Sequence, residues 1–364
     1  MRKRQGTVHG RWTAVATASL LGLVACSAGN GPSSSSTGGS GKGDANVVVV
    51  ADGGGSYHDS QVKTTYEPCA KDLGIKVTST SYDYTIGPIR AQVNGAKQWD
   101  VVSLGNPMDP KLEEELLQPI DYNVVQQAGL PEDAKLKYQV VYVYFAWVPT
   151  YRTDKFSGDK PQSWADVWDV KRFPGPRGLL NYPIGTLEIA LMADGVPYDQ
   201  LYPLDLDRAF RKLDELRNNG KVVWYNSGAE QAQQVANGIV SVSAAWNGRI
   251  TQVKGEGVPA DFTMNGALLQ GTSWGVLKTA PHPETAMKFI ECATSPAVGA
   301  ADTIDFVGNA PANLDAFKDM PADVADGVPS NPKFKDTIAG TVDWAWWGKN
   351  FDTIYQRWQD WYAK

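Results

Sequence analysis

Short apolar runs alternate with amphipathic segments along most of the chain. Residues 47–51 form a continuous run of β-branched and small apolar residues, which is typical of a buried parallel strand. A helical pattern follows up to residue 73, and a second apolar run begins at residues 74–77. This region therefore predicts a strand–helix–strand unit at the start of the folded part.

The same alternation continues toward the C-terminus. We expect further strands at residues 99–104, 140–148, 179–181, 222–225, 239–245 and 268–277. We expect helices at residues 86–96, 112–117, 186–193, 206–218, 227–237, 283–293 and 340–363, with another helix start at Ser163. Repeated strand–helix alternation predicts an α/β fold with mostly parallel sheets.

Two of these strands are candidates for connections between lobes. Residues 140–148 carry many aromatic side chains and run up to Pro149, and residues 268–277 form a second β-like run. A chain of 364 residues is long enough for two domains. We therefore expect the first strand to cross from one lobe to the other and the second strand to cross back.

Trp246 is the residue most suggestive of a binding site. It ends the apolar run 239–245 and stands directly before Asn247 and Gly248. Open α/β sheets bind ligands at the carboxyl ends of their strands. Trp246 is therefore expected in the wall of a cleft, and the alternative is that it is an ordinary core residue.

The first 45 residues have the pattern of an export signal and a tether. Positive charges precede an apolar run at residues 12–25, which is typical of a signal peptide. The segment ending at Cys26 resembles a lipobox, so residues 1–25 are expected to be removed and Cys26 lipidated; a chance cysteine in an ordinary signal peptide is the alternative. Residues 26–45 are rich in Gly and Ser, as in a flexible tether. The expected location is extracytoplasmic, anchored to the membrane by the lipid.

Composition limits the classes of partner that the protein can bind. The formal net charge of −6 with no basic patch argues against nucleic acid as a partner. Thirteen Trp and fifteen Tyr fill a core, and their surplus also suits the binding of apolar or cationic small molecules. Cys69 and Cys292 remain after the leader is removed, and in an oxidising compartment they form either a disulfide or two buried free thiols.

The sequence carries no recognisable catalytic or cofactor motif. Only His58 and His282 follow the leader, so a metal site built from several histidines is not expected. The chain lacks HExxH and CxxC patterns and shows no GxSxG nucleophile elbow between a strand and a helix. The glycines at 53–55 form either a tight turn or a loop whose N–H groups, up to Ser56, face a ligand. We expect no enzyme activity, no cofactor and no metal.

Several segments together resemble a known family. They are Asp100-Val101-Val102, residues 113–121, the SWADVWD run at 163–169, residues 236–238 leading to 245–249, and residues 284–290 followed by Ser295-Pro296. In this order they resemble the extracellular solute-binding proteins of ABC transporters, specifically the spermidine/putrescine type. The resemblance covers nearly the whole chain after the tether.

The resemblance implies a two-lobed fold like that of type II periplasmic binding proteins, with a ligand in the hinge cleft. It places residues 46–147 and 278–315 in lobe 1 and residues 148–277 and 316–364 in lobe 2. Both cysteines would then lie in lobe 1, where a bridge leaves the hinge free. The implied partners are a small solute of the amine or polyamine kind and the permease subunits of an importer, which the protein serves as a monomer.

The resemblance also implies a ligand-binding set. It consists of Ser56, Tyr57, Asn106, Glu188, Trp246, Trp274 and Asp305. Carboxylates would hold an amine and the aromatic rings would clamp its methylenes. Val276 and Gly185 stand where the family has acids, so one amine, on Glu188 or Asp305, is easier to support than two.

Two alternatives stay open. The ligand could be anionic or zwitterionic, held by the N–H groups of residues 53–56 with Arg90 or Arg249. A ferric-ion binder is disfavoured because no adjacent Tyr-Tyr pair exists. From another class, an extracytoplasmic hydrolase could use Glu188 and an Asp as paired carboxylates.

Overall fold

The computed structural model describes residues 46–364, apart from residues 106, 107, 109 and 307. The expected leader at 1–25, the tether at 26–45 with Cys26, and Asn106 lie outside the described residues. Within the described ranges, no helix combines the length and apolar character needed to cross a bilayer.

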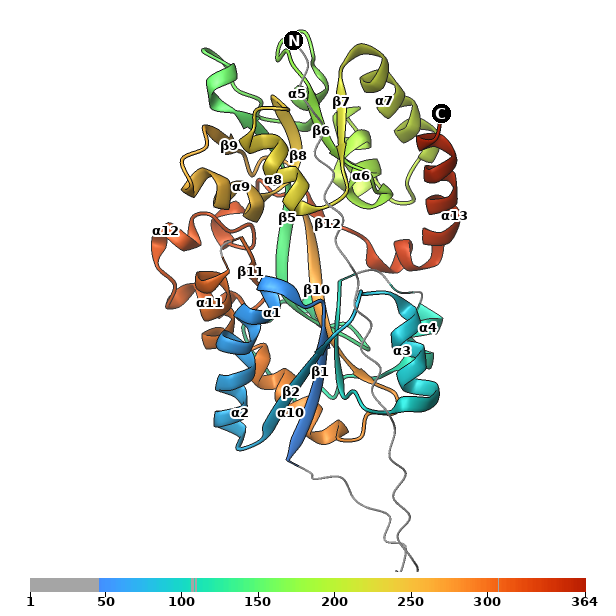
Figure 1. The fold of residues 1–364 in the computed structure, drawn as a ribbon, viewed down its shortest axis with the longest axis vertical. Helices are drawn as coiled ribbons and strands as arrows, with labels where there is room; N and C mark the ends of the chain where they lie inside the picture. The colour runs from blue at the N-terminus through green and yellow to red at the C-terminus, as the bar shows by residue number, and fades with distance from the viewer. Residues whose placement is uncertain (1–45, 106–107, 109, 307) are drawn as a thin grey trace, which may run out of the picture. The chain divides into compact units, whose positions relative to one another are not determined.

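One mixed sheet runs through the described part of the chain (Figure 1). Its main strands are ordered β2-β1-β3-β10-β5-β8-β6-β7. The strands are β1 Val47–Asp52, β2 Lys76–Ser81, β3 Val101–Leu104, β4 Leu117–Gln118, β5 Val140–Arg152, β6 Arg177–Leu180, β7 Val222–Tyr225, β8 Val242–Trp246, β9 Ala260–Phe262, β10 Leu268–Leu277, β11 Ala310–Pro311 and β12 Gly340–Thr341. Short strands β4, β9, β11 and β12 pair with β5 or β10.

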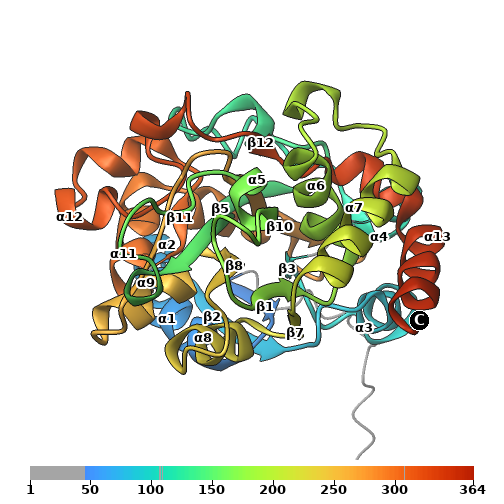
Figure 2. The ribbon, with the colours of Figure 1, turned by 90° about the horizontal axis from the view of Figure 1, so that it is seen from above.

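The helices follow the predicted alternation. They are α1 Gly55–Gln61, α2 Glu67–Leu73, α3 Ile86–Ala91, α4 Pro110–Leu116, α5 Trp164–Trp168, α6 Pro183–Ala193, α7 Leu206–Asn219, α8 Gly228–Ala236, α9 Asn247–Gly255, α10 Pro283–Ala293, α11 Pro296–Asp305, α12 Ala322–Ala325 and α13 Trp344–Tyr362. Helices α6, α7 and α13 lie together (Figure 2).

The central strands β5 and β10 join two lobes. At one edge β1 is parallel to β2 and β3, and at the other β6 is parallel to β7 and β8. Between these groups β10 and β5 are antiparallel to each other and to their neighbours β3 and β8. The predicted crossing strands at 140–148 and 268–277 are therefore present as β5 and β10. We call the part around β1–β3 the first lobe and the part around β6–β8 the second lobe.

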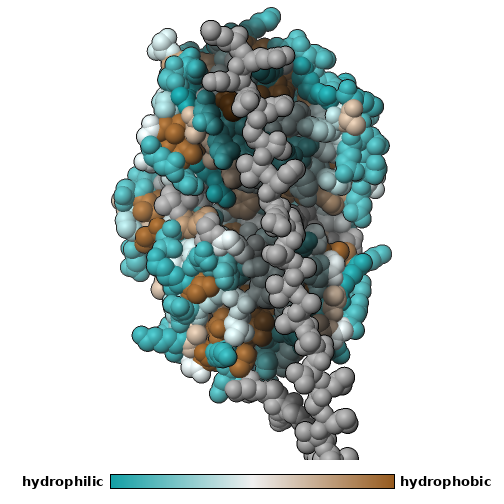
Figure 3. All heavy atoms as spheres, in the orientation of Figure 1, coloured by the Kyte–Doolittle hydropathy of each residue, from teal (hydrophilic) through white to brown (hydrophobic). Residues whose placement is uncertain are grey.

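Each lobe has its own hydrophobic core. Twelve of the thirteen residues of β5 are buried, as expected for a strand that is covered on both faces. Tyr144 belongs to the core of the first lobe, and Trp147 belongs to that of the second. Helix α13 contributes Trp347, Trp358 and Trp361 to the second core. Outside these cores, hydrophilic residues cover most of the visible face and apolar areas are small (Figure 3).

The packing differs from the expected lobe boundaries at two places. Trp274 and Val276 lie in the core of the first lobe, because the second half of β10 pairs with β3. Met320 and Val328 also pack in that core, beyond residue 315. We expected the end of β10 and residues 316–328 in the second lobe, but residues of both segments pack in the core of the first lobe.

Candidate functional site

Trp246 lies at the end of β8, directly before α9. Its half-buried ring faces Phe145 edge-on, with 5.9 Å between ring centroids, and lies 6.0 Å from the ring of Trp147. The indole Nε1 has no hydrogen-bond partner within the described part of the chain. Helix α9 starts at Asn247, directly after the strand.

Trp246 forms part of the wall of a cavity of about 760 Å³, which we call the Trp246 cavity. One side comes from β5, β8 and α9, and the other side from the end of α11 and the segment after it. The lining residues are Phe145, Trp246, Gly248, Arg249, Thr251, Gln252, Gly255, Asp305, Phe306, Gly308 and Asn309. The cavity is therefore bounded by both lobes.

Arg249 is the cation of the Trp246 cavity. It is half-buried, and it has no hydrogen bond or ion pair with any residue that the structure describes. Its side chain packs beside Trp246 against Gly228, the first residue of α8. A Cβ on Gly228 would lie 2.7 Å from Arg249 Nε and 3.0 Å from the Trp246 ring, so a larger residue there would have to displace the Arg249 side chain.

The opposite wall carries a carboxylate that already has a cationic partner. Asp305 pairs with Lys63 and accepts a hydrogen bond from Ser60 Oγ at 2.9 Å. The hydrogen bond from Lys63 lowers the pKa of Asp305. Because Lys63 offsets Asp305, Arg249 gives the cavity an uncompensated positive charge.

Tyr57 stands behind this wall. Its ring lies 5.0 Å from that of Phe306, and its hydroxyl donates to Asp302 Oδ2 at 3.2 Å. Burial raises the pKa of the Tyr57 hydroxyl well above its usual value, so it stays a neutral donor. Burial also raises the pKa of Asp302 to about 6. Tyr57 thus supports the position of Phe306, and the backbone of Ser56 lies next to it in α1.

Asn247 connects the two lobes below the cavity. It is fully buried; its Oδ1 accepts a hydrogen bond from Ala146 N at 2.9 Å, and its Nδ2 donates to Gly308 O at 3.1 Å. Its amide holds the start of α9 against both β5 and the segment that follows α11.

Glu188 lies elsewhere, in the core of the second lobe. It is fully buried and accepts hydrogen bonds from Tyr202 Oη at 2.7 Å, Trp347 Nε1 at 2.5 Å and Gly185 N at 2.9 Å. Burial raises its pKa. Gly185 has a φ of 80°, and a Cβ there would lie 2.7 Å from the ring of Trp147. An acid at position 185 therefore has no room beside Glu188.

Trp274 is also a core residue. It has no exposed surface, stacks on Tyr142 with 4.3 Å between ring centroids, and meets Phe289 edge-on at 6.1 Å. Of the expected binding set, the structure brings together Trp246, Asp305 and, behind them, Tyr57. It places Glu188 and Trp274 away from the Trp246 cavity.

Sequence reasoning missed Phe145 and put Arg249 only among the alternatives. Phe145 is the one half-buried residue of β5, but exposure of a single position cannot be read from a strand whose residues are nearly all apolar. Arg249 lies three residues after Trp246, which is the N-cap of α9. This spacing places both side chains on the same face at the start of the helix.

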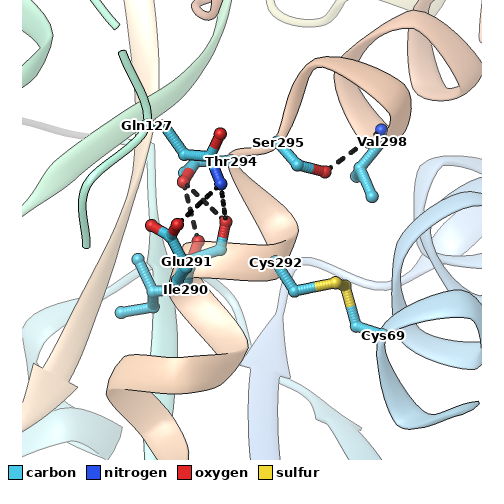
Figure 4. Close-up of a disulfide and its surroundings, with 8 residues drawn as sticks. All are labelled: Cys69, Gln127, Ile290, Glu291, Cys292, Thr294, Ser295 and Val298. Carbon is cyan, nitrogen blue, oxygen red and sulfur yellow. Dashed lines mark hydrogen bonds between the residues drawn. A yellow bond between two sulfur atoms is a disulfide. The ribbon is translucent and has the colours of Figure 1, made fainter. Parts of the chain in front are cut away.

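A disulfide joins Cys69 of α2 to Cys292 of α10 (Figure 4). Both helices belong to the first lobe, so the bond crosslinks that lobe without tying it to the other. Among the residues that the structure describes, no group of three or more His, Cys, Asp or Glu side chains is arranged to hold a metal ion.

Comparison with known proteins agrees with this architecture. Residues 64–336 match the family model described as bacterial extracellular solute-binding protein. The chain is 31% identical to the gamma-aminobutyric acid-binding protein of Pseudomonas aeruginosa, over 87% of this chain and 91% of that protein.

Two solved structures are also similar. An ABC transporter substrate-binding protein from Bradyrhizobium japonicum shares 37% identity, with a TM-score of 0.78 over 86% of this chain and 99% of that one. The structure of a GABA receptor shares 32% identity, with a TM-score of 0.80 over 88% of this chain and 98% of that one.

The fold and the interlobe cavity thus define a two-lobed binding protein. The chain belongs to the bacterial extracellular solute-binding proteins. The predicted family and two-lobed α/β fold are confirmed, as is the predicted role as a small-solute binding component of an ABC importer.

Proposed function

We propose that the protein captures a small zwitterionic amino acid of the γ-aminobutyric acid (GABA) kind and delivers it to an importer. The observation that carries this proposal is the unpaired Arg249 in the wall of the Trp246 cavity. A guanidinium that faces a cavity without a protein partner keeps its hydrogen-bond donors available for an anionic ligand.

The carboxylate end of the ligand binds at Arg249. A guanidinium offers two parallel N–H donors to a carboxylate, and such charge-assisted bonds are among the strongest in proteins. Gly228, the first residue of α8, packs against the Arg249 side chain. The partial positive charge of the helix N-terminus therefore adds to the attraction.

The ammonium end faces the aromatic side of the cavity. The rings of Phe145, Trp246 and Phe306 line it, whereas the carboxylate of Asp305 is already paired with Lys63. An ammonium over an aromatic face gains about 0.5–2 kcal/mol, with the larger value in a dry site. The carboxylate of the ligand thus meets Arg249, and its amine meets the aromatic rings.

A polyamine fits this arrangement less well. A second ammonium would meet Arg249, and Glu188 is enclosed by three neutral donors in the core. Two similar proteins, the relative from Pseudomonas aeruginosa and the solved receptor, are named for GABA. The zwitterionic alternative from the sequence is therefore favoured over the polyamine.

Titration calorimetry with isolated ligands tests the proposal. We expect the protein to bind GABA and to bind putrescine at least about 100-fold more weakly, since putrescine replaces the carboxylate by an ammonium of similar reach. Glutarate, in which a second carboxylate replaces the ammonium of GABA, is the other comparison ligand. Tight binding of putrescine with no heat from GABA would overturn the assignment.

We also propose that the mature protein starts at a lipidated Cys26, acts as a monomer, docks on permease subunits and leaves its ligand chemically unchanged. Ser56 and Asn106 stay predicted ligand contacts. Labelling of expressing cells with palmitate tests the anchor: Cys26→Ser should lose both the label and membrane retention. Mass spectrometry of ligand recovered after incubation tests the absence of turnover.

A further inference from the structure

A second cavity lies between the lobes, and the function proposed above does not use it. It has a volume of about 690 Å³, and we call it the Tyr84 cavity. The first lobe contributes the segment from Tyr84 to Arg90, the end of β3 and part of α4; the second lobe contributes Tyr182 and the middle of α13. A ligand in this cavity would touch both lobes, as a ligand that favours closure must.

Aromatic rings form opposite sides of this cavity. Tyr84 has a backbone φ of 58°, which is uncommon for a residue with a side chain, and its ring packs directly on Gly53. On the other side Tyr182 packs against Phe351 with 5.8 Å between ring centroids. Burial raises the pKa of Tyr182 to about 12, so its hydroxyl is neutral at physiological pH. Such walls suit a flat apolar group.

The rim of the Tyr84 cavity carries an excess of positive charge. Arg90 and Lys349 line it together with one acid, Asp352. Arg90 is exposed and has no hydrogen bond or ion pair to any described residue. An anionic group at the outer end of a flat substituent would therefore meet a free guanidinium.

Gln270 neighbours a wall residue of each of the two cavities. In the register of β10 with β5 it lies opposite Phe145, which lines the Trp246 cavity. Its Nε2 donates to Gly105 O at 3.2 Å, and Gly105 lines the Tyr84 cavity. Gln270 thus links a wall residue of one cavity to a wall residue of the other, and both cavities are bounded by the same pair of lobes.

We propose that the Tyr84 cavity is a second subsite of the same cleft, and that the protein takes N-substituted amino acids with a flat substituent ending in an acidic group. This inference rests on the proposed function, because the amino acid part is held at Arg249. The substituent extends past Gln270 to lie between Tyr84 and Tyr182, with its acid at Arg90.

Calorimetry with three probes tests the subsite: GABA, N-benzyl-GABA and N-(4-carboxybenzyl)-GABA. All three keep a basic amine and the first carboxylate. In the wild type we expect the carboxybenzyl compound to bind at least about 10-fold more tightly than GABA. Tyr182→Ala should reduce this affinity ratio to about 1, and Arg90→Gln should remove only the difference between the benzyl and carboxybenzyl compounds.

Matched variants separate local from general effects. Tyr362→Ala removes an exposed tyrosine of α13, and Lys71→Gln removes an exposed cation of the first lobe; both should keep the wild-type ratio. Binding of GABA with at least tenfold weaker binding of both substituted probes would overturn the subsite and leave the proposed function intact. A ratio that survives Tyr182→Ala would also overturn it, and a lack of binding by all three probes would refute the proposed function itself.

Discussion

Glu188 and Arg249 are two charged side chains of the second lobe with opposite surroundings. Glu188 is fully buried and receives three hydrogen bonds from Tyr202, Trp347 and Gly185. Arg249 lines a cavity of about 760 Å³ and has no partner among the described residues. A charge whose hydrogen bonds are complete inside the protein serves the fold, whereas a charge left open toward a cavity serves a ligand.

The largest effect is expected at Glu188. Glu188→Ala leaves three buried donors without an acceptor, so the free energy of unfolding should fall by about 3–5 kcal/mol. Urea denaturation measures this loss, and Glu256→Ala, an exposed residue at the end of α9, should change stability by less than about 0.5 kcal/mol. A stable Glu188→Ala protein that no longer binds ligand would show that Glu188 serves ligand binding and not the fold.

A second effect concerns the pH dependence of stability at Asp302, behind the Trp246 cavity. Its folded pKa is raised to about 6 by burial, above the value of about 3.9 in the unfolded chain. The protonated form is thus favoured in the folded state, so Asp302 contributes its full stabilisation below pH 3.9, and this stabilisation is lost as the pH rises through 6. Relative to Asp302→Asn, the free energy of unfolding of the wild type should fall by roughly 2–3 kcal/mol between pH 4 and pH 7.

Denaturant titrations of both proteins at several pH values measure this difference. Asparagine cannot ionise, so the difference between the two curves isolates Asp302 from all other titrating groups. A difference that does not change between pH 4 and pH 7 would show that Asp302 titrates as it does in the unfolded chain.

A smaller effect is expected at the wall of the cavity. Trp246→Leu removes an aromatic face that is half-buried, so affinity for GABA should fall about 10-fold, with little loss of stability. Trp99→Leu, at a half-buried tryptophan in the first lobe that lines neither interlobe cavity, is the matched variant. Equal losses of affinity in the two variants would mean that Trp246 acts only through packing.

The sequence predicted the architecture well because long apolar runs have few alternatives. Residues 140–148 are too apolar for an exposed strand and residues 268–277 carry a β-like pattern, and both cross between the lobes as β5 and β10. The position of Trp246 followed from its place at the end of a strand. These features depend on local pattern, which the sequence contains.

The sequence could not place Trp274 or Glu188, because their surroundings come from distant segments. Alternation in β10 shows that Trp274 lies on one face, but not that Tyr142 and Phe289 cover that face. Glu188 is enclosed by Trp347, which is 159 residues away in the chain. Arg249 was ambiguous for the same reason: only the fold shows that no neighbour neutralises it.

The most direct test of the account compares GABA with its amide, 4-aminobutanamide, in the wild type, Arg249→Met and Lys254→Met. Lys254 is an exposed cation on the same helix, paired with Asp261. If Arg249 binds the carboxylate, the wild type and Lys254→Met should prefer GABA over the amide by about 10–100-fold, and Arg249→Met should show a preference of less than about 3-fold. An Arg249→Met protein that keeps the full preference for the acid would contradict the assignment of Arg249 as the anion-binding residue.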